Sequence, residues 1–332
     1  MTERSDPRAY GATADGRARP GSGPVPAATR PGRFGAGTGD NPRIGYRTVS
    51  LRVAGAVGVV GAAVVLLVLL GPLGALLAHL TPGTVRAALA GPGALQPLVT
   101  SVEASAVSLG VLVVVGTPLA WAMARGRLPA PRAWETGVLV PLLMPPLVIG
   151  LLLVFLAGPA TPVGQGLAHV HLSASNTFFA LVVAETYESA PYYILGAEAA
   201  FAGVDRELEE HAALLGDSPA RAFRRITLPL AAPGLASALS MAWARAIGAF
   251  GAVIIIAYHP YGLPMWIWVT LQQSGLAAAL PFALVLLVVA LPLPLVAYVW
   301  TARARSDSVA GSSGVADVAP AGWATRPVRA RR

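Results

Sequence analysis

Three long stretches of this 332-residue chain contain no charged side chain: residues 53–78, 104–124 and 137–184. Only 12% of all residues are charged, whereas soluble domains contain about 25%. A helix of about 20 apolar residues crosses the hydrocarbon core of a bilayer and satisfies its own backbone hydrogen bonds there. The sequence therefore predicts an integral membrane protein built from helices.

The apolar stretches predict an all-α fold with six transmembrane helices. They are expected at residues 53–78, 99–124, 137–158, 177–201, 234–257 and 277–300. Residues 1–50 are rich in Pro, Gly, Ala and Arg, a composition typical of disordered segments. The predicted organisation is a transmembrane domain at 51–303 between two disordered tails, 1–50 and 304–332.

The chain has neither lysine nor cysteine, and its 24 basic side chains are all arginine. A Walker A phosphate loop and a Schiff base both require lysine, and disulfides require cysteine. We therefore expect no ATP site of that type and no cofactor on this chain. The net charge of +8 fits arginine-rich cytoplasmic loops better than a nucleic-acid surface.

The arginines also predict the orientation in the membrane. The loops at 125–136 and 203–230 contain Arg125, Arg127, Arg132, Arg206, Arg221, Arg224 and Arg225, whereas those at 79–97, 158–176 and 258–276 contain only Arg86. Short loops rich in arginine stay on the cytoplasmic side. Both termini and the 203–230 loop are therefore expected in the cytoplasm.

The 203–230 loop, here called the 203–230 hairpin, has the pattern of two short helices. Gly216 is expected to end the first helix with a positive φ. The second helix is expected to begin near Pro219, a favoured first residue, and to stop at Pro229. Apolar residues recur at helical spacing, at Val204, Leu208, Ala212 and Leu215 in the first helix and Ala222, Phe223 and Ile226 in the second.

One spacing in the hairpin resembles a signature of importer permeases of the ATP-binding-cassette (ABC) class. Their pattern is E-A-A, three residues, G, nine residues, then I-x-L-P. The matching positions are Glu210, His211, Ala212, Gly216, Ile226, Leu228 and Pro229, and only His211 departs from it. The resemblance implies that these residues form a coupling helix, which docks on a separate ATPase subunit.

Four further runs resemble permeases for oxyanions. GTPLAWAMARGRLP at 116–129, PLLMPPLVIGLLL at 141–153 and ARAIGAFGAVIIIA at 244–257 are similar to runs of sulfate and molybdate permeases. In the third run, Ala249 replaces a usual glutamate. AYHPYGLPMWIW at 257–268 is most similar to the molybdate/tungstate branch. The implied cargo is molybdate or tungstate, with sulfate or another small solute as the alternative.

The same resemblance implies the partners and the location. A homodimer of the chain would enclose a path in a bacterial or archaeal cell membrane. An ATPase dimer, carrying ATP and Mg²⁺, would bind inside, and an extracytoplasmic binding protein would deliver the substrate. The chain itself would be a transport subunit and not an enzyme.

Several residues inside the predicted spans are candidates for the path or its gate: Arg245, Pro145, Pro146, Gly248 and Gly251. A charge within the membrane either pairs with another charge or faces water. Arg245 is expected to pair with Glu185 or Glu188, which lie on one helix face, or alternatively to line an anion path. No metal site is expected, because His169 and His171 lie in a loop without nearby acids.

Two functions of other classes remain as alternatives. An ion-coupled secondary transporter would use Glu185 and Glu188 for coupling, and it would show an internal repeat, which the sequence lacks. An intramembrane enzyme would need a catalytic pattern such as HExxH, which is also missing.

Overall fold

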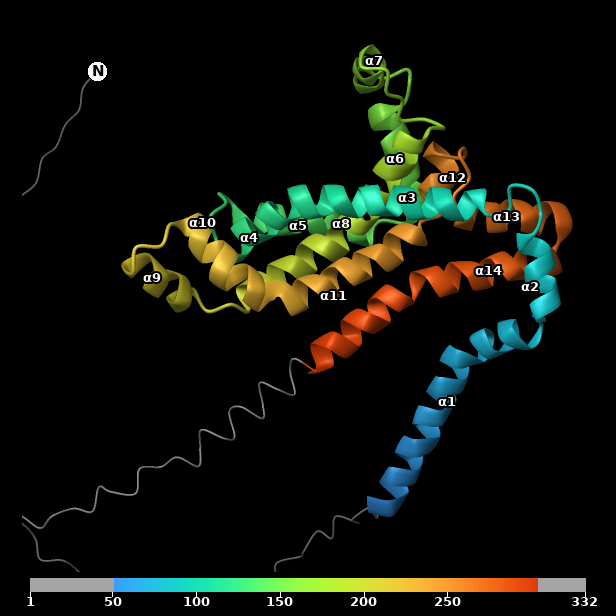
Figure 1. The fold of residues 1–332 in the computed structure, drawn as a ribbon, viewed down its shortest axis with the longest axis horizontal. Coiled ribbons are helices and arrows are strands. Elements are labelled where there is room, and N and C mark those ends of the chain that lie inside the picture. The colour runs from blue at the N-terminus through green and yellow to red at the C-terminus, as the bar shows by residue number, and fades with distance from the viewer. Residues whose placement is uncertain (1–50, 304–332) are drawn as a thin grey trace, which may run out of the picture. The chain divides into compact units, whose positions relative to one another are not determined.

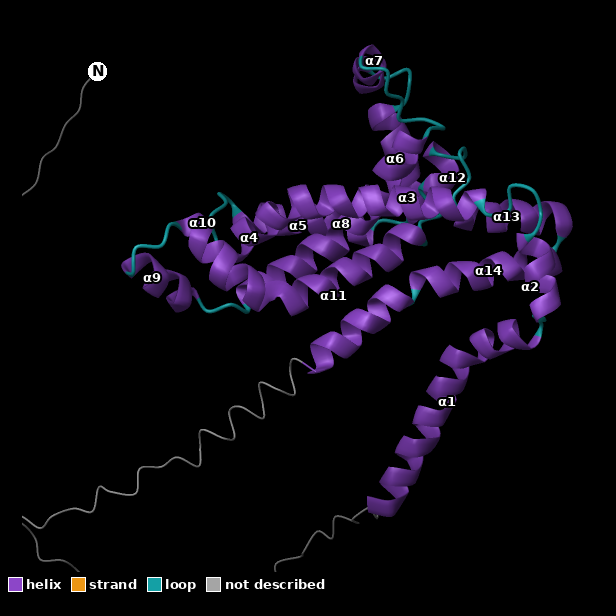
Figure 2. Ribbon diagram, viewed as in Figure 1, coloured by secondary structure: helices purple, strands orange, loops and turns teal. Residues whose placement is uncertain are grey.

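The computed structural model describes residues 51–303, with side chains from residue 57 onward. Both predicted tails, 1–50 and 304–332, lie outside these residues. All regular structure within the described part is helical, as the sequence predicts (Figure 1 and Figure 2). The helices are α1 (Leu51–Ala78), α2 (Pro82–Leu89), α3 (Gln96–Val111), α4 (Thr117–Ala124), α5 (Pro131–Leu143), α6 (Pro146–Ala157), α7 (Pro162–His169), α8 (Phe178–Ala202), α9 (Arg206–Leu214), α10 (Pro219–Ala222), α11 (Leu228–Ile247), α12 (Val253–Ile256), α13 (Leu263–Ser274) and α14 (Leu276–Ala290).

Four helices in the described part are long and apolar enough to cross a membrane: Val57–Ala78, Gln96–Ala124, Pro219–Ile247 and Leu276–Arg303. A fifth is added if α5 and α6, which are bent by 115°, form one broken span. Helix α8 has 25 residues, but it contains three glutamates and is not among the apolar four. The six predicted spans are therefore found in part, and the full count stays a prediction.

Helix α8 packs against α3, α4, α5 and α11 (Figure 1). Its first half forms one apolar cluster with α6 and α12, which includes Leu181 and Ile256. Its second half forms another cluster with α4 and α11, which includes Phe201. Alanines at the second contact, Ala197, Ala231, Ala238 and Ala242, are buried. Small residues allow membrane helices to approach closely. Helices α8 and α11 therefore form the core that positions the hairpin.

The fifth predicted span begins and ends earlier than the sequence predicts. The helix covers Pro219–Ile247 instead of 234–257 and breaks before α12. The prediction that Pro229 stops the helix is wrong, because Pro229 follows a π-helical turn at Phe223–Thr227 and lies in the first turn of α11. Regular i→i−4 bonding is interrupted at such a turn, and a residue without an N–H is tolerated in a first turn.

The third predicted span, 137–158, is not one straight helix. It is broken between α5 and α6, where Met144 and Pro145 are extended, with ψ of 139° and 133°. A proline disfavours helical backbone at the residue before it, and two consecutive prolines therefore end α5 and start α6. Helix α13 has only 12 residues, which is too short to cross the membrane.

Candidate functional site

The 203–230 hairpin folds into the short helix α9 and the first turns of the continuous helix Pro219–Ile247, which are joined by a tight turn. Helix α9 ends just before Gly216, whose φ is 90°, so the prediction of a positive φ is confirmed. The Asp217 N–H donates to the Ala212 carbonyl oxygen at 2.9 Å, which closes the helix end. Helix α10 begins at Pro219, as the sequence predicts.

The hairpin has one buried and one exposed side. Ala212 and Ala222 are 6% and 4% exposed, whereas Leu214 and Leu215 are 85% and 89% exposed. Of the apolar residues that recur along the first helix, Leu208 is 43% exposed, and Leu215 follows the end of α9 at Leu214. Of the other motif residues, Ile226 is half-buried, and Glu210, His211, Gly216, Leu228 and Pro229 are exposed.

A buried arginine joins the hairpin to the helices behind it. Arg125 follows α4, and its side chain is 4% exposed. Its Nη2 lies 2.5 Å from Glu209 Oε1, and its Nε donates to the same oxygen at 3.2 Å. Its Nη1 donates to the carbonyl oxygens of Phe201 and Val204, both at 3.1 Å. Thr227 Oγ1 also donates to Glu209 Oε1, so one cluster connects the ends of α4, α8, α9 and the helix that leads into α11.

The Glu209 carboxylate is stabilised in its charged form by this cluster. Burial opposes ionisation, but hydrogen bonds from Arg125 and Thr227 and the charges of Arg125 and Arg127 outweigh it. Together they hold the pKa of Glu209 below its ordinary value. Glu209 is therefore an acceptor held by a buried cation, whereas its neighbour Glu210 is exposed.

A second ion pair lies between α8 and α11. Arg245 Nη2 is 2.5 Å from Glu188 Oε2, and the Glu188 side chain is fully buried. Glu188 Oε1 accepts the Ala252 N–H at 3.0 Å. Glu185 bonds instead to Ser105 Oγ, at 2.9 Å. The structure thus selects Glu188 as the partner of Arg245, whose side chain remains 24% exposed.

The start of α6 lies against the break after α11. A Cβ added to Gly251 would lie 2.4 Å from Pro146 Cβ, so only glycine fits at this contact. Pro146 and Gly251, two of the predicted path residues, are therefore brought together, and Arg245 and Gly248 lie just before Gly251 along the chain. Pro145 directly precedes the contact as the last extended residue before α6.

Within residues 51–303, no three His, Asp or Glu side chains converge in a way that would hold a metal ion. His169 ends α7, and His171 follows it in the next loop. Glu185 and Glu188 already have the partners given above. These residues thus offer no metal centre in the described part of the chain.

Residues 114–305 match the protein family described as the inner membrane component of binding-protein-dependent transport systems. The chain belongs to this family. The matched region runs from the end of span two through the last helix, and it contains the hairpin, the Arg125 cluster and the Arg245–Glu188 pair. As an inner membrane component with several membrane-capable helices, the protein is a multi-pass membrane protein and a transport subunit.

Relatives of this inner membrane component have names that agree with the resemblance found in its motifs. A probable molybdenum ABC transporter permease protein of Haloferax volcanii is 41% identical over 69% of this chain and 84% of its own length. The molybdenum transport system permease protein ModB of Mycobacterium tuberculosis is 34% identical, over 60% of this chain and 76% of ModB. The molybdate/tungstate permease protein WtpB of Thermococcus kodakarensis is 34% identical, over 53% of this chain and 66% of WtpB.

The fold of this inner membrane component also occurs in a solved transporter. A chain of a bacterial alginate ABC transporter, in complex with an alginate-bound periplasmic protein, superposes with a TM-score of 0.59. The match covers 74% of this chain and 93% of that chain at 18% identity. At this identity the likeness concerns the fold alone.

Sequence reasoning missed the Arg125 cluster. It used Arg125 only as an indicator of orientation, and the motif that it identified begins at Glu210, one residue after Glu209. The two side chains are 84 residues apart in the sequence, and no local pattern pairs them. The one available signal is that Arg125 directly follows an uncharged span, where an arginine at the end of a helix can reach carbonyl oxygens.

Proposed function

We propose that this chain is the membrane-spanning permease subunit of an ABC importer for molybdate or tungstate. The observation that carries the proposal is the hairpin spacing from Glu210 to Pro229, found in a chain whose relatives are named molybdenum or molybdate/tungstate permeases. Sulfate remains the alternative cargo, because the motif runs at 116–129 and 141–153 are also similar to those of sulfate permeases.

The hairpin is proposed to dock on a separate ATPase subunit in the cytoplasm. Its exposed leucines support this role: Leu208, Leu214 and Leu215 are 43%, 85% and 89% exposed. Exposed apolar residues gathered in one place are typical of interaction surfaces. Glu210 and His211 are exposed on the same helix and supply polar contacts. This docking places both termini in the cytoplasm and requires α8 to cross the membrane as one of six spans.

The Arg125 cluster gives the docked hairpin a rigid connection to the spans. Motion of the ATPase would move α9, and the bonds from Arg125 to Glu209, Phe201 and Val204 would pass that motion to α4 and α8. Because Pro219–Ile247 is one continuous helix, the second half of the hairpin would move α11 directly. Alternating access then needs no chemistry on the cargo.

The contact between α6 and the break after α11 is proposed as part of the gate. Pro146 and Gly251 meet there, and a change in the tilt of α11 would separate them. Arg245 is partly exposed and held by Glu188, so it can offer a weak attraction to an anion along the path. A weak site suffices, since a binding protein outside would select the oxyanion. Two copies of the chain would enclose the path between them.

Disruption of the gene tests the cargo in cells. We expect uptake of molybdate and tungstate at trace concentration to be lost, and to return when the intact gene is restored. Sulfate uptake should be unchanged. Loss of sulfate uptake with normal molybdate and tungstate uptake would instead support the alternative cargo.

A further inference from the structure

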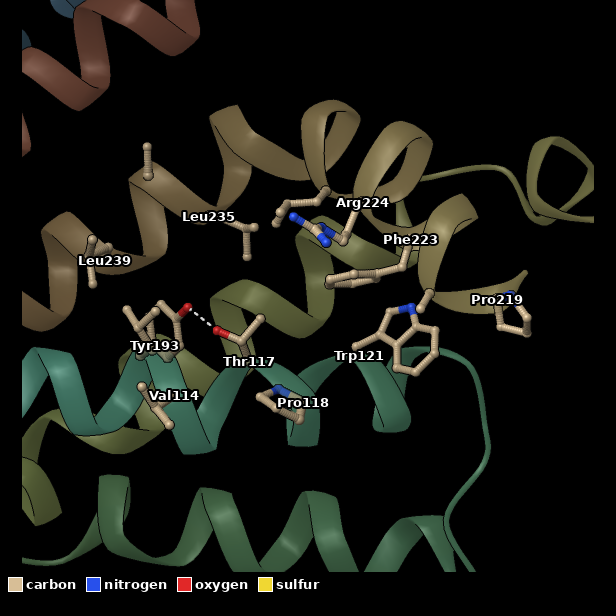
Figure 3. A pocket seen from close by; sticks show the side chains of 14 residues that line it. Val114, Thr117, Pro118, Trp121, Tyr193, Pro219, Phe223, Arg224, Leu235 and Leu239 are labelled. Atoms are coloured by element: carbon tan, nitrogen blue, oxygen red, sulfur yellow. Dashed lines mark hydrogen bonds between the residues drawn. The ribbon is translucent and has the colours of Figure 1, made fainter. Parts of the chain in front are cut away.

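An apolar groove of about 770 Å³ lies between the end of span two, α8 and the helix that runs from α10 into α11 (Figure 3). Its walls include Val113, Val114, Phe223, Leu235 and Leu239. Thr117 and Tyr193 also line it, but their hydroxyl oxygens lie 2.6 Å apart and bond to each other. The groove therefore offers a wall that suits a hydrocarbon chain.

One end of this groove is basic. Arg224 lines the groove, and it also lines an adjoining hollow of about 580 Å³ together with Arg221 and Arg225. Arg221 pairs with Asp217 at 3.1 Å. Within the described residues, no carboxylate forms an ion pair with Arg224 or Arg225. Among the described residues, Arg224 and Arg225 are thus two cations without an ion-pair partner at the end of the apolar wall.

We propose that the groove holds an acyl chain of an anionic phospholipid of the cytoplasmic leaflet, with the phosphate between Arg224 and Arg225. This inference rests on the orientation given under Proposed function, which places the hairpin on the cytoplasmic side. Anionic lipids are concentrated in that leaflet, and basic pockets between helices at its surface bind their headgroups.

The dimensions of the groove match one leaflet. Its α11 wall extends from Leu228 to Leu239, a rise of about 16 Å at 1.5 Å per residue. Half of the hydrocarbon core is about 15 Å thick. A lipid with its phosphate at Arg224 would therefore lay one acyl chain along the whole groove. Because Phe223 and Arg224 belong to the hairpin, the bound lipid would contact the segment that moves during transport.

Lipid binding to the purified full-length chain tests the proposal. Native mass spectrometry in detergent compares phosphatidylglycerol with phosphatidylcholine of the same acyl chains, without ATPase, nucleotide or oxyanion. Phosphatidylglycerol should bind more tightly. Each arginine near the surface contributes about 1 kcal/mol, or about fivefold. The double variant Arg224→Gln/Arg225→Gln should therefore bind phosphatidylglycerol about 25-fold more weakly. Its affinity for phosphatidylcholine should be unchanged.

Two further variants separate the groove from general charge. Leu235→Trp fills the groove and should lower the affinity for both lipids. Arg132→Gln removes an exposed arginine of α5 that lies outside the groove, and it should bind both lipids as the unchanged chain does. Either of two results overturns the proposal. One is equal affinity of the chain for the two lipids, and the other is that the double variant binds phosphatidylglycerol as well as Arg132→Gln does.

Other occupants of the groove give distinct results. The chain lacks cysteine, so Leu235→Cys has a single thiol, and efficient disulfide formation between two copies in membranes would assign the groove to a subunit contact. If the double variant no longer binds the ATPase but still binds phosphatidylglycerol, the two arginines contact the ATPase instead of the lipid. Either result contradicts the lipid site. Because lipid binding is measured without transport, failure of the transport proposal would leave this readout intact.

Discussion

Replacement of Glu209 by alanine removes the acceptor that holds the hairpin to the spans. Arg125 would keep its two bonds to the carbonyl oxygens of Phe201 and Val204, but its charge would be left without a counter-ion. Its side chain is only 4% exposed, so solvent compensates a lost carboxylate less well there than at the surface. Thr227 would lose its acceptor as well.

The size of the loss follows from the burial of the two groups. Removal of one partner from a buried ion pair costs about 3–5 kcal/mol. Glu209 is 17% exposed and Arg125 retains two acceptors, so we expect the lower end, about 3 kcal/mol of unfolding free energy. Glu209→Gln keeps an acceptor and loses the charge, and a charged hydrogen bond is worth about 1.5–3 kcal/mol, so the loss should be smaller.

Reversible unfolding of the purified chain in mixed micelles measures this loss. The matched control is Glu210→Ala, because Glu210 is the next residue and is exposed. Its unfolding free energy should stay within about 0.5 kcal/mol of the unchanged chain. Glu209→Ala with a loss no larger than this control would refute the structural role of the pair. In the assembled transporter, the exposed residue should matter more for ATPase binding. Glu210→Arg should weaken the ATPase contact. Glu209→Ala should still bind the ATPase but import less cargo per ATP.

The same pair has a defined pH dependence. The pKa of Glu209 is held below its ordinary value in the folded chain, so its contribution is fully present above the unfolded value, about 4.3. It is lost as the pH falls through the lower folded value. The stability gap between the unchanged chain and Glu209→Gln should be constant near neutral pH and shrink below about pH 4.3. A gap that grows on acidification would contradict this assignment.

Three other substitutions test the remaining parts of the site. Gly216→Val should lower transport and cost about 1–2 kcal/mol, because its φ of 90° disfavours a β-branched residue; Gly216→Asn should be tolerated, and equal uptake by both variants would argue against the turn. Arg245→Ala should reduce the yield of folded protein, and the double variant Arg245→Ala/Glu188→Ala should restore it. If the arginine also serves the path, uptake by the double variant should stay low. A yield that falls further in the double variant would contradict the pairing. Gly251→Ala should impair uptake by separating α6 from the break after α11, whereas Gly137→Ala, where an added Cβ meets nothing within 4 Å, should not; normal uptake by Gly251→Ala would remove this contact from the gate.

The sequence predicts the helical class and the turn of the hairpin well, because local rules decide them. Long apolar stretches predict the spans at 99–124 and 277–300 close to their observed ends. Gly216 and Pro219 have strong backbone preferences, so the turn between α9 and α10 follows from these two residues. The prediction at Pro229 fails because a π-helical turn depends on packing along the whole helix.

Long-range pairing is what the sequence could not supply. Glu185 and Glu188 are equivalent candidates on one helix face, and only the approach of α11 assigns Arg245 to Glu188. Arg125 and Glu209 are brought together by the ends of three helices. The contact between Pro146 and Gly251 likewise depends on how α6 folds back at the double proline. Each of these pairs joins segments that share no local pattern.

Uptake into proteoliposomes tests the central claim most directly. The chain is reconstituted with the proposed ATPase subunit and binding protein, and accumulation of molybdate and tungstate is measured with ATP on the ATPase side. We predict accumulation that requires ATP and all three components, is not reduced by excess sulfate, and is abolished by Gly216→Val. Accumulation without the ATPase, or driven by an ion gradient in the absence of ATP, would contradict the account.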